Sequence, residues 1–182
     1  MKKQLKEIFD FTLPVVAAII IALLLKTFVF ANAIVPTGSM LSTIQENDRI
    51  IASKLAYITD KPERYDIIIF KFPDDDANGI TTYYVKRVIG LPGETVNIKN
   101  GIVYVTDTDG NEERLRNDFI TECTPDGDFG PYKVPKDSYF VLGDNRNNSL
   151  DSRYWETTNY VHKSKIIGKV MFRYYPSVKK IE

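Results

Sequence analysis

The stretch "YYVKRVIGLPGETVNIKNGIVYV", Tyr83 to Val105, contains three runs of strand-forming residues that are separated by short polar or glycine-containing segments. Valine, isoleucine and tyrosine dominate these runs, as they do in β-strands. Between the last two runs, Asn100-Gly101 suits the positive φ angles that a tight hairpin turn requires. The stretch therefore predicts consecutive strands of an antiparallel sheet.

Runs of the same kind occur on both sides of this stretch. Each is four to ten residues long and is bounded by Gly, Pro, Asp or Asn: "RIIASKLAY", "YDIIIFKF", "SYFVLGD" and "GKVMFRYY". A second turn is predicted at Asp109-Gly110, and short helices are expected only around Gln45 to Tyr57 or Glu112 to Phe119. The pattern predicts a mainly β domain, built as a barrel or as two sheets with long connections.

A long apolar segment precedes the β domain. Residues 11–25, "FTLPVVAAIIIALLL", carry no charge, and extending the run to Val35 adds only Lys26 as a charged residue. About twenty such residues cross a bilayer. Pro14 falls in the first turn of the expected helix, where its missing N–H costs little. The sequence predicts a single transmembrane anchor over residues 11–32.

Lysines outnumber acidic residues in the first ten residues, which favours a cytoplasmic N-terminus. The expected organisation is therefore a cytoplasmic segment (1–10), the anchor and an extracytoplasmic β domain (33–182), within which residues from about 97 to 135 form a smaller excursion or second lobe. The alternative is a cleaved signal peptide, because Ala31-Asn32-Ala33 mimics a cleavage site. A mature chain that begins at Ile34 would support that alternative.

The composition excludes several classes of site. The 24 basic residues balance the 24 acidic ones, so nucleic acid is not an expected partner. One cysteine, Cys123, cannot form an internal disulfide, and with the single histidine, His162, it cannot build a metal cluster. His162 is expected on the surface, and the three aspartates of "FPDDDANG" (72–79) are expected in solvent rather than around calcium. No metal and no cofactor are predicted.

A candidate nucleophile follows the apolar segment, in "AIVPTGSMLSTI", Ala33 to Ile44. Gly38 allows a sharp bend that presents Ser39 with its own N–H directed at a developing oxyanion, and the Thr37 hydroxyl is a second donor. The same residues are also typical of a simple linker turn. No histidine is placed to act as the base.

Lys86, in the central strand pattern, is the candidate base. Strand alternation places it on the face of Tyr84 and Val88, with Arg87 on the other face. At its ordinary pKa only about one lysine in 2500 is neutral at pH 7. Burial would lower the pKa and make the amine a competent general base. The alternative is a strand lysine whose ammonium extends into water.

A third polar segment is "GDNRNNSLDSR", Gly143 to Arg153. Its side chains favour hydrogen bonds to the local backbone. We expect ion pairs of Asp144 with Arg146 and of Asp151 with Arg153, and Ser149 is placed to orient a neutral lysine amine. Taken alone, the segment is typical of a polar turn.

Together, the apolar segment, "PTGSM", "YDIIIF", "YVKRVIGLPGE" and "GDNRNNSLDSR" resemble type I signal peptidases over nearly the whole chain. These are membrane-bound Ser-Lys endopeptidases with two antiparallel β-sheet domains, and the short segment from Glu94 to Gly143 is similar to the compact Gram-positive members. The resemblance implies cleavage of signal peptides from exported preproteins at the outer membrane face, after small residues at positions −3 and −1. It also implies the lipid bilayer and signal peptides as partners.

The resemblance implies a role for each matching residue. Ser39 is the acylating nucleophile and Lys86 its general base, the Ser39 N–H and the Thr37 hydroxyl form the oxyanion hole, and Ser149 steadies the amine. Other residues hold the loop beneath the site: Asp144, Arg146, Asp151 and Arg153. A third set lines the substrate groove: Ile34, Val35, Pro36, Met40, Ile44, Tyr84 and Val85.

The sequence departs from the family pattern at three positions. Ser42 stands in place of a usual Pro, Tyr65 in place of a Gly, and Glu94 in place of a frequent Asp. None of them is a reacting group. Two other functions fit parts of the pattern, a Ser-Lys self-cleaving protease and a membrane-tethered β domain that binds peptides without cutting them.

Overall fold

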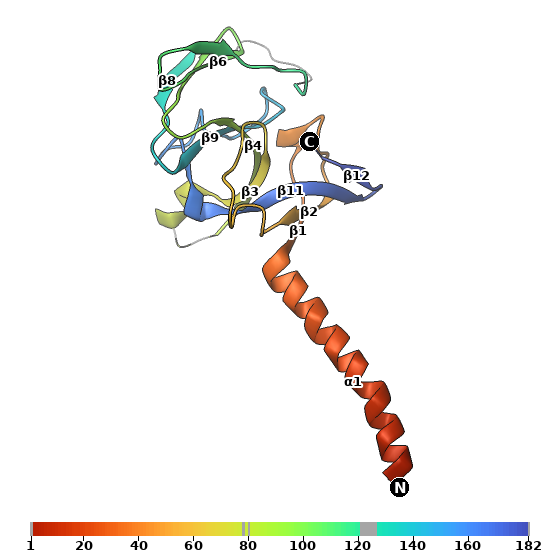
Figure 1. Cartoon of the computed structure of the whole chain (residues 1–182). Coiled ribbons are helices and arrows are strands. Elements are labelled where there is room, and N and C mark those ends of the chain that lie inside the picture. The colour runs from red at the N-terminus through yellow and green to blue at the C-terminus, as the bar shows by residue number, and fades with distance from the viewer. Residues whose placement is uncertain (1, 78, 80, 121–126, 182) are drawn as a thin grey trace.

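The computed structural model describes residues 2–77, 79, 81–120 and 127–181. A long helix, α1 (Lys2–Leu24), continues into a π-helical turn (Leu25–Val29) and then into a β domain (Figure 1). Within these elements, Phe9–Val29 is long and apolar enough to cross a membrane and has no part buried in the protein. Figure 1 shows α1 extending away from the β domain, in agreement with the absence of burial along this span.

The larger sheet follows directly from the end of α1. All its neighbouring strands are antiparallel. Their order is β1 (Phe30–Ile34), β2 (Arg49–Ser53), β11 (Ile166–Tyr175), β3 (Ile67–Lys71), β4 (Tyr83–Gly90), β9 (Ser138–Leu142) and β10 (Val161–His162), with β12 (Lys179–Lys180) paired to β11. Short 3-10 turns lie at Gly38–Met40, Pro73–Ala77 and Lys163–Lys165.

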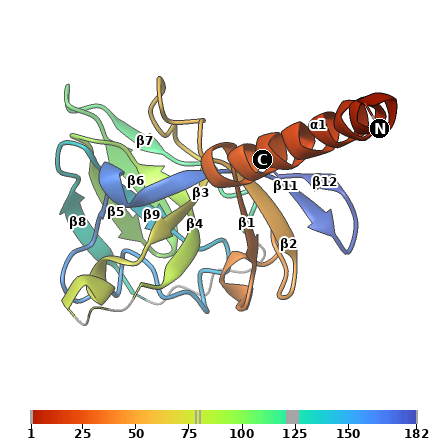
Figure 2. The same cartoon turned by 90° about the horizontal axis from the view of Figure 1, so that it is seen from below.

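The smaller sheet lies on the side of the domain away from α1 (Figures 1 and 2). Its order is β7 (Glu112–Arg114), β6 (Ile102–Thr106), β5 (Thr95–Lys99) and β8 (Phe129–Lys133). Asn100 and Gly101 have φ angles of 51° and 75°, so the predicted hairpin between β5 and β6 is confirmed. The prediction of a mainly β protein with two antiparallel sheets is also confirmed.

Three apolar clusters hold these layers together. One lies beneath β1, β2, β3 and β11, and a second joins β4 and β9 of the larger sheet to the smaller sheet. The third is rich in aromatic rings, with Phe70 and Trp155 at 5.8 Å between ring centroids. Each fully buried large apolar side chain stabilises the fold by about 1.5–3 kcal/mol relative to an exposed one.

Both predicted short helices are wrong. The Gln45 to Tyr57 segment contains β2, and the Glu112 to Phe119 segment contains β7. Alternating burial along β2 removes Ile50 and Ala52 from water, and pairing with β1 and β11 satisfies its backbone. This tertiary pairing outweighs a helical propensity that is small for each residue.

Two smaller expectations also differ from the structure. The helical part of the predicted anchor ends at Val29, and residues 30–32 belong to β1. In "FPDDDANG", Asp74 accepts N–H groups of Glu156 and Thr157 at 3.0 and 3.1 Å, and Asp75 accepts the N–H of Thr82. These two carboxylates therefore fix loops, as short polar side chains often do.

Candidate active site

Ser39 lies in the 3-10 turn that follows β1. The first N–H groups of such a turn have no acceptor within it, so the position suits a donor to a bound anion. Gly38 is buried in this turn, and an added Cβ there would lie 2.8 Å from Leu41 Cδ1, so a larger residue would require the Leu41 side chain to move. Asn145 holds the turn from the other side, because its N–H donates to the Ser39 carbonyl and its Nδ2 to the Gly38 carbonyl, each at 3.1 Å.

Lys86 reaches Ser39 from β4. Its Nζ lies 2.6 Å from the Ser39 Oγ, which is a direct hydrogen bond. Only 3% of the lysine is exposed, and the amine lies 5.3 Å from the centroid of the Tyr84 ring. The structure thus brings together the predicted nucleophile and the predicted base, which lie 47 positions apart in the sequence.

Burial lowers the pKa of Lys86 from its ordinary value to about 8. The charges of Asp151 and Asp144 oppose this shift, whereas that of Arg153 supports it. With this pKa about a tenth of the amine is neutral at pH 7, roughly two hundred times the fraction of an ordinary lysine. Both carboxylates are themselves paired with arginines, so their charge stabilises the ammonium only weakly.

Asp144 is paired with Arg87, not with Arg146 as the sequence suggested. Arg87 Nε and Nη2 donate to the two carboxylate oxygens at 2.8 and 2.7 Å, and the side chains are 1% and 0% exposed. Thr43 Oγ1 donates to Asp144 at 2.5 Å. Other parts of the protein cover both faces of β4 in this region. Side-chain alternation along the strand therefore places Arg87 in a buried site on the face opposite that of Lys86, and not in solvent.

The remainder of the loop, Gly143 to Arg153, closes on itself. The expected ion pair of Asp151 and Arg153 is present, with Nε–Oδ1 at 2.8 Å and Nη2–Oδ2 at 3.0 Å. Asp151 also accepts the Gly143 N–H at 3.0 Å, and Arg146 Nε donates to the Gly143 carbonyl at 3.0 Å. These bonds fix the chain directly before Asn145, which holds the Ser39 turn.

One predicted supporting residue, Ser149, lacks the expected contact, and the predicted oxyanion donor Thr37 lies at the cavity. Ser149 is buried, but its Oγ has no hydrogen-bond partner in the described part of the chain, so it does not bond to Lys86. It packs against Gly143 so closely that an added Cβ there would lie 2.2 Å from the hydroxyl. Thr37 is exposed and does not cap the 3-10 turn, although it lines the cavity that contains Ser39.

That cavity has a volume of about 910 Å³. Six of the seven predicted groove residues line it, namely Ile34, Val35, Pro36, Met40, Tyr84 and Val85. The seventh, Ile44, is fully buried in the core beneath β1 and is not a groove residue, because the turn after Met40 directs it inward. The sequence reasoning missed other lining residues, among them Asn32, Ile69, Tyr83 and Leu150.

Two open strand edges border this cavity. Within the described strands, β1 is the last strand of the larger sheet, and β9 pairs with β4 only from Arg87 onward. The segment Tyr83–Lys86 therefore pairs with β3 on one side alone. Both edges leave backbone donors and acceptors available to an added extended chain.

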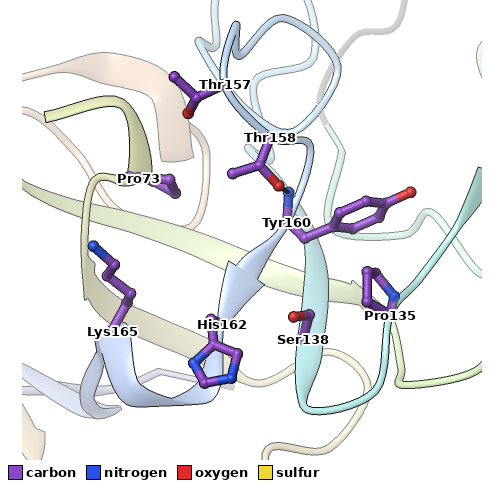
Figure 3. A pocket seen from close by; sticks show the side chains of 8 residues that line it. All are labelled: Pro73, Pro135, Ser138, Thr157, Thr158, Tyr160, His162 and Lys165. Carbon is purple, nitrogen blue, oxygen red and sulfur yellow. Dashed lines mark hydrogen bonds between the residues drawn. The ribbon is translucent and has the colours of Figure 1, made fainter. Parts of the chain in front are cut away.

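A second cavity, of about 400 Å³, lies between Pro73, Pro135, Ser138, Thr157, Thr158, Tyr160, His162 and Lys165 (Figure 3). It shares no lining residue with the cavity of Ser39. His162 is exposed, and its Nδ1 lies 2.8 Å from Ser164 Oγ. Its surface position agrees with the sequence analysis, and it does not contact Ser39.

No group of three or more potential metal ligands occurs within the described residues. Cys123 lies outside those residues. The site therefore consists of a serine, a buried lysine, a turn with unpaired N–H groups and a groove with two open strand edges. This set of groups is suited to acyl transfer from an extended peptide.

Comparison with known proteins adds three findings. A family model described as "Signal peptidase, peptidase S26" matches residues 8–175. Signal peptidase I of Leptolyngbya laminosa is 41% identical over 162 residues, which cover 87% of this chain and 75% of the relative. Signal peptidase I S of Bacillus subtilis is 35% identical over 178 residues, which cover 94% of this chain and 91% of the relative. A solved signal peptidase I from Enterococcus faecalis is 31% identical, with a TM-score of 0.45, and covers 60% of this chain and 97% of that one.

Proposed function

The chain belongs to the signal peptidase family, peptidase S26, and is a serine peptidase of the signal peptidase I type. From this premise we propose that it removes signal peptides from exported preproteins with Ser39 as nucleophile and Lys86 as general base. The observation that carries this assignment is the 2.6 Å contact between the serine hydroxyl and a lysine amine that is almost completely buried.

The reaction proceeds in two acyl-transfer steps. Neutral Lys86 takes the Ser39 proton while the oxygen attacks the scissile carbonyl carbon, and the resulting ammonium then protonates the leaving amine. Lys86, again neutral, next takes a proton from water, which attacks the acyl-enzyme ester. The collapse of the second intermediate returns that proton to Ser39 and releases the signal peptide with a free carboxylate.

The developing oxyanion is bound by the Ser39 N–H, with the Thr37 hydroxyl as second donor. The N–H lies in the first turn of the 3-10 segment, where the backbone leaves it available. Thr37 lines the same cavity, and its side chain forms no capping hydrogen bond to the 3-10 turn. Loss of one such donor typically lowers kcat by about 10²–10³-fold.

The substrate binds as an extended chain between β1 and the open part of β4. Alternate residues of an extended chain point to the same side, so positions −1 and −3 both face one wall of the groove. Ile34, Val35 and Tyr84 line that groove. We propose that they form shallow pockets that select alanine-like residues at these two positions, because larger side chains would clash there.

The apolar N-terminal helix indicates a membrane-anchored protein. We place its N-terminus in the cytoplasm, on the charge of the first ten residues, and the β domain outside, with a single crossing at Phe9–Val29. Ser39 follows only ten residues after Val29. This short connection keeps the nucleophile near the outer membrane surface, where the cleavage site of an inserted preprotein emerges.

Incubation of the lipid-reconstituted protein with a preprotein, followed by mass determination of the products, tests the proposal. We expect one cut, after a small residue with another small residue two positions earlier. Ser39→Ala should yield no product, whereas Ser164→Ala, which removes an exposed serine, should cut normally. Binding without cleavage by the unaltered protein, or full cleavage by Ser39→Ala, would contradict the proposal.

The pH dependence follows from the lowered pKa of Lys86. Only the neutral amine accepts the Ser39 proton, and burial sets its pKa at about 8. We expect kcat/KM to rise about tenfold per pH unit below that value and to level off above it. Initial rates on a fluorogenic peptide between pH 6 and 10 would give the midpoint, and a rate that keeps rising to pH 10 would contradict the expected pKa.

A further inference from the structure

A stack of aromatic rings lies behind the wall of the cavity that contains Ser39. Tyr84 forms part of this wall, and its ring centroid lies 5.3 Å from the Lys86 amine. The Phe72 ring stacks on Tyr84, with the two planes 5° apart and the centroids at 4.3 Å. Phe72 is not among the residues that line the cavity, so its link to the amine runs through Tyr84.

The fold holds Phe72 in place from two directions. Its N–H donates to the Thr82 carbonyl at 2.9 Å, which continues the pairing of β3 with β4. Its ring meets Trp155 edge-on at 5.7 Å between centroids, and Trp155 is buried. Asp74 fixes the chain next to this indole, because its carboxylate accepts the Glu156 N–H at 3.0 Å. Backbone pairing and a buried indole thus support the stack.

The stack limits the movement of the Tyr84 ring. Parallel rings at this distance attract each other, so Tyr84 cannot turn away without losing the contact. Tyr84 itself stays neutral, because burial raises the pKa of its hydroxyl. Burial is also the largest cause of the lowered pKa of Lys86, and it outweighs the attraction of the ring for the ammonium. A Tyr84 ring that rotates freely would admit water to the amine.

We propose that Phe72 is a positioning residue for the general base: it holds the Tyr84 ring against Lys86 and so keeps water from the amine. Trp155 supports Phe72 from behind. The inference rests on the proposed function, in which neutral Lys86 activates Ser39. It adds a residue that touches neither the substrate nor the reacting atoms.

The charged groups around Lys86 are separate from this stack. Asp151 and Asp144 favour the ammonium and Arg153 disfavours it, and all three belong to the loop that follows β9. Phe72 carries no charge. A change in the pKa of Lys86 after substitution of Phe72 therefore reports the access of water to the amine.

The pH profile of Phe72→Leu tests the inference in the full-length protein in lipid. We expect the midpoint of kcat/KM to move from about 8 to about 9. A fluorogenic peptide would then be cut about tenfold more slowly at pH 7 but at nearly the normal rate at pH 10. Phe72→Tyr keeps a ring that can stack on Tyr84, so it should restore the normal midpoint. Trp155→Phe, which weakens the support, should shift the midpoint in the same direction by less.

Phe140→Leu is the matched control. Phe140 is a fully buried phenylalanine that packs on Tyr132 at 4.9 Å, in the cluster that joins the two sheets. The substitution should lower stability and leave the pH midpoint unchanged. A loss of rate in Phe72→Leu that is equal at every pH, or a midpoint shift of the same size in Phe140→Leu, would overturn the inference.

Titration of the Lys86 side chain by NMR gives a second reading that needs no turnover. In the substrate-free protein, the midpoint for Lys86 should be about one pH unit higher in Phe72→Leu than in the unaltered protein or in Phe72→Tyr. Equal midpoints in the three proteins would overturn the inference. Failure of the unaltered protein to cut a preprotein would instead contradict the proposed function itself.

Discussion

Replacing Lys86 with methionine is expected to lower the rate of preprotein cleavage by at least about 10³-fold while the fold remains intact. Methionine fills nearly the same volume and suits a site that is only 3% exposed, but it cannot accept the Ser39 proton. Single-turnover kinetics with saturating preprotein would measure the loss in the chemical step.

The same variant should be more stable than the unaltered protein at neutral pH. The folded-state pKa of Lys86, about 8, lies below the ordinary value of 10.5, so holding the protonated amine in the fold is unfavourable below pH 8. This cost is about 3 kcal/mol at pH 7, and it disappears as the pH rises from 8 to 10.5. The lost bond to Ser39 offsets about 1 kcal/mol of the gain.

Lys99→Met serves as the control, because Lys99 is exposed on β5 in the smaller sheet. It should change neither the cleavage rate nor the pH dependence of unfolding. Chemical unfolding in detergent micelles at several pH values would show whether the advantage of Lys86→Met shrinks above pH 8. Cleavage by Lys86→Met at the normal rate would contradict the assignment of the base.

Replacing Asp144 with alanine is expected to destabilise the fold by about 3–5 kcal/mol. The substitution leaves the Arg87 guanidinium, which is 1% exposed, without its bidentate partner in the protein interior. Cleavage should be lost as well, because the next residue, Asn145, holds the carbonyls of Gly38 and Ser39. Denaturant unfolding and a cleavage assay would measure the two effects.

Asp118→Ala is the matched control, since Asp118 forms a surface ion pair with Arg116 in which both side chains are more than half exposed. An exposed pair of this kind contributes less than about 1 kcal/mol. The double variant Arg87→Met with Asp144→Leu should recover much of the lost stability, because it removes both buried charges. An unfolding free energy of Asp144→Ala similar to that of Asp118→Ala would contradict the role of the buried pair.

Most of the sheet structure could be predicted from the sequence. β-branched and aromatic runs with Gly, Pro, Asp or Asn at their ends mark β2, β3, β4, β5, β6, β9 and β11, and Asn100-Gly101 marks the hairpin. β1 was missed, because "FANAI" continues an apolar helical segment without a break in composition. Its strand form depends on pairing with β2, which no local pattern encodes.

The sequence also predicted the pair of residues, Ser39 and Lys86, that the structure brings into contact, but it did not predict most of the residues that hold them in place. A serine after glycine and a lysine within a strand of apolar residues gave the candidate pair, and the fold supplies the 2.6 Å contact. The bond of Arg87 to Asp144 joins positions 57 apart, and that of Asn145 to Gly38 joins positions 107 apart. Such long-range pairs have no signal in the local sequence.

Tyr65 shows how a departure from a family pattern is accommodated. Its φ of 75° is the left-handed conformation that favours glycine, the residue usual at this position in the family it resembles. A non-glycine residue costs about 1–2 kcal/mol there. The ring offsets this cost by packing on Phe119 at 5.7 Å and beneath Arg116 at 4.5 Å, and the Tyr65 carbonyl accepts a hydrogen bond from Arg87 at 2.9 Å.

Titration of the Lys86 amine tests the central claim most directly. With lysine labelled at the carbon next to the amine, the chemical shift of Lys86, assigned by its absence in Lys86→Met, can be followed from pH 6 to 11 in detergent micelles. We expect a midpoint near pH 8, the value that burial sets. A midpoint at or above 10, where an ordinary exposed lysine titrates, would contradict the proposal that a neutral amine activates Ser39.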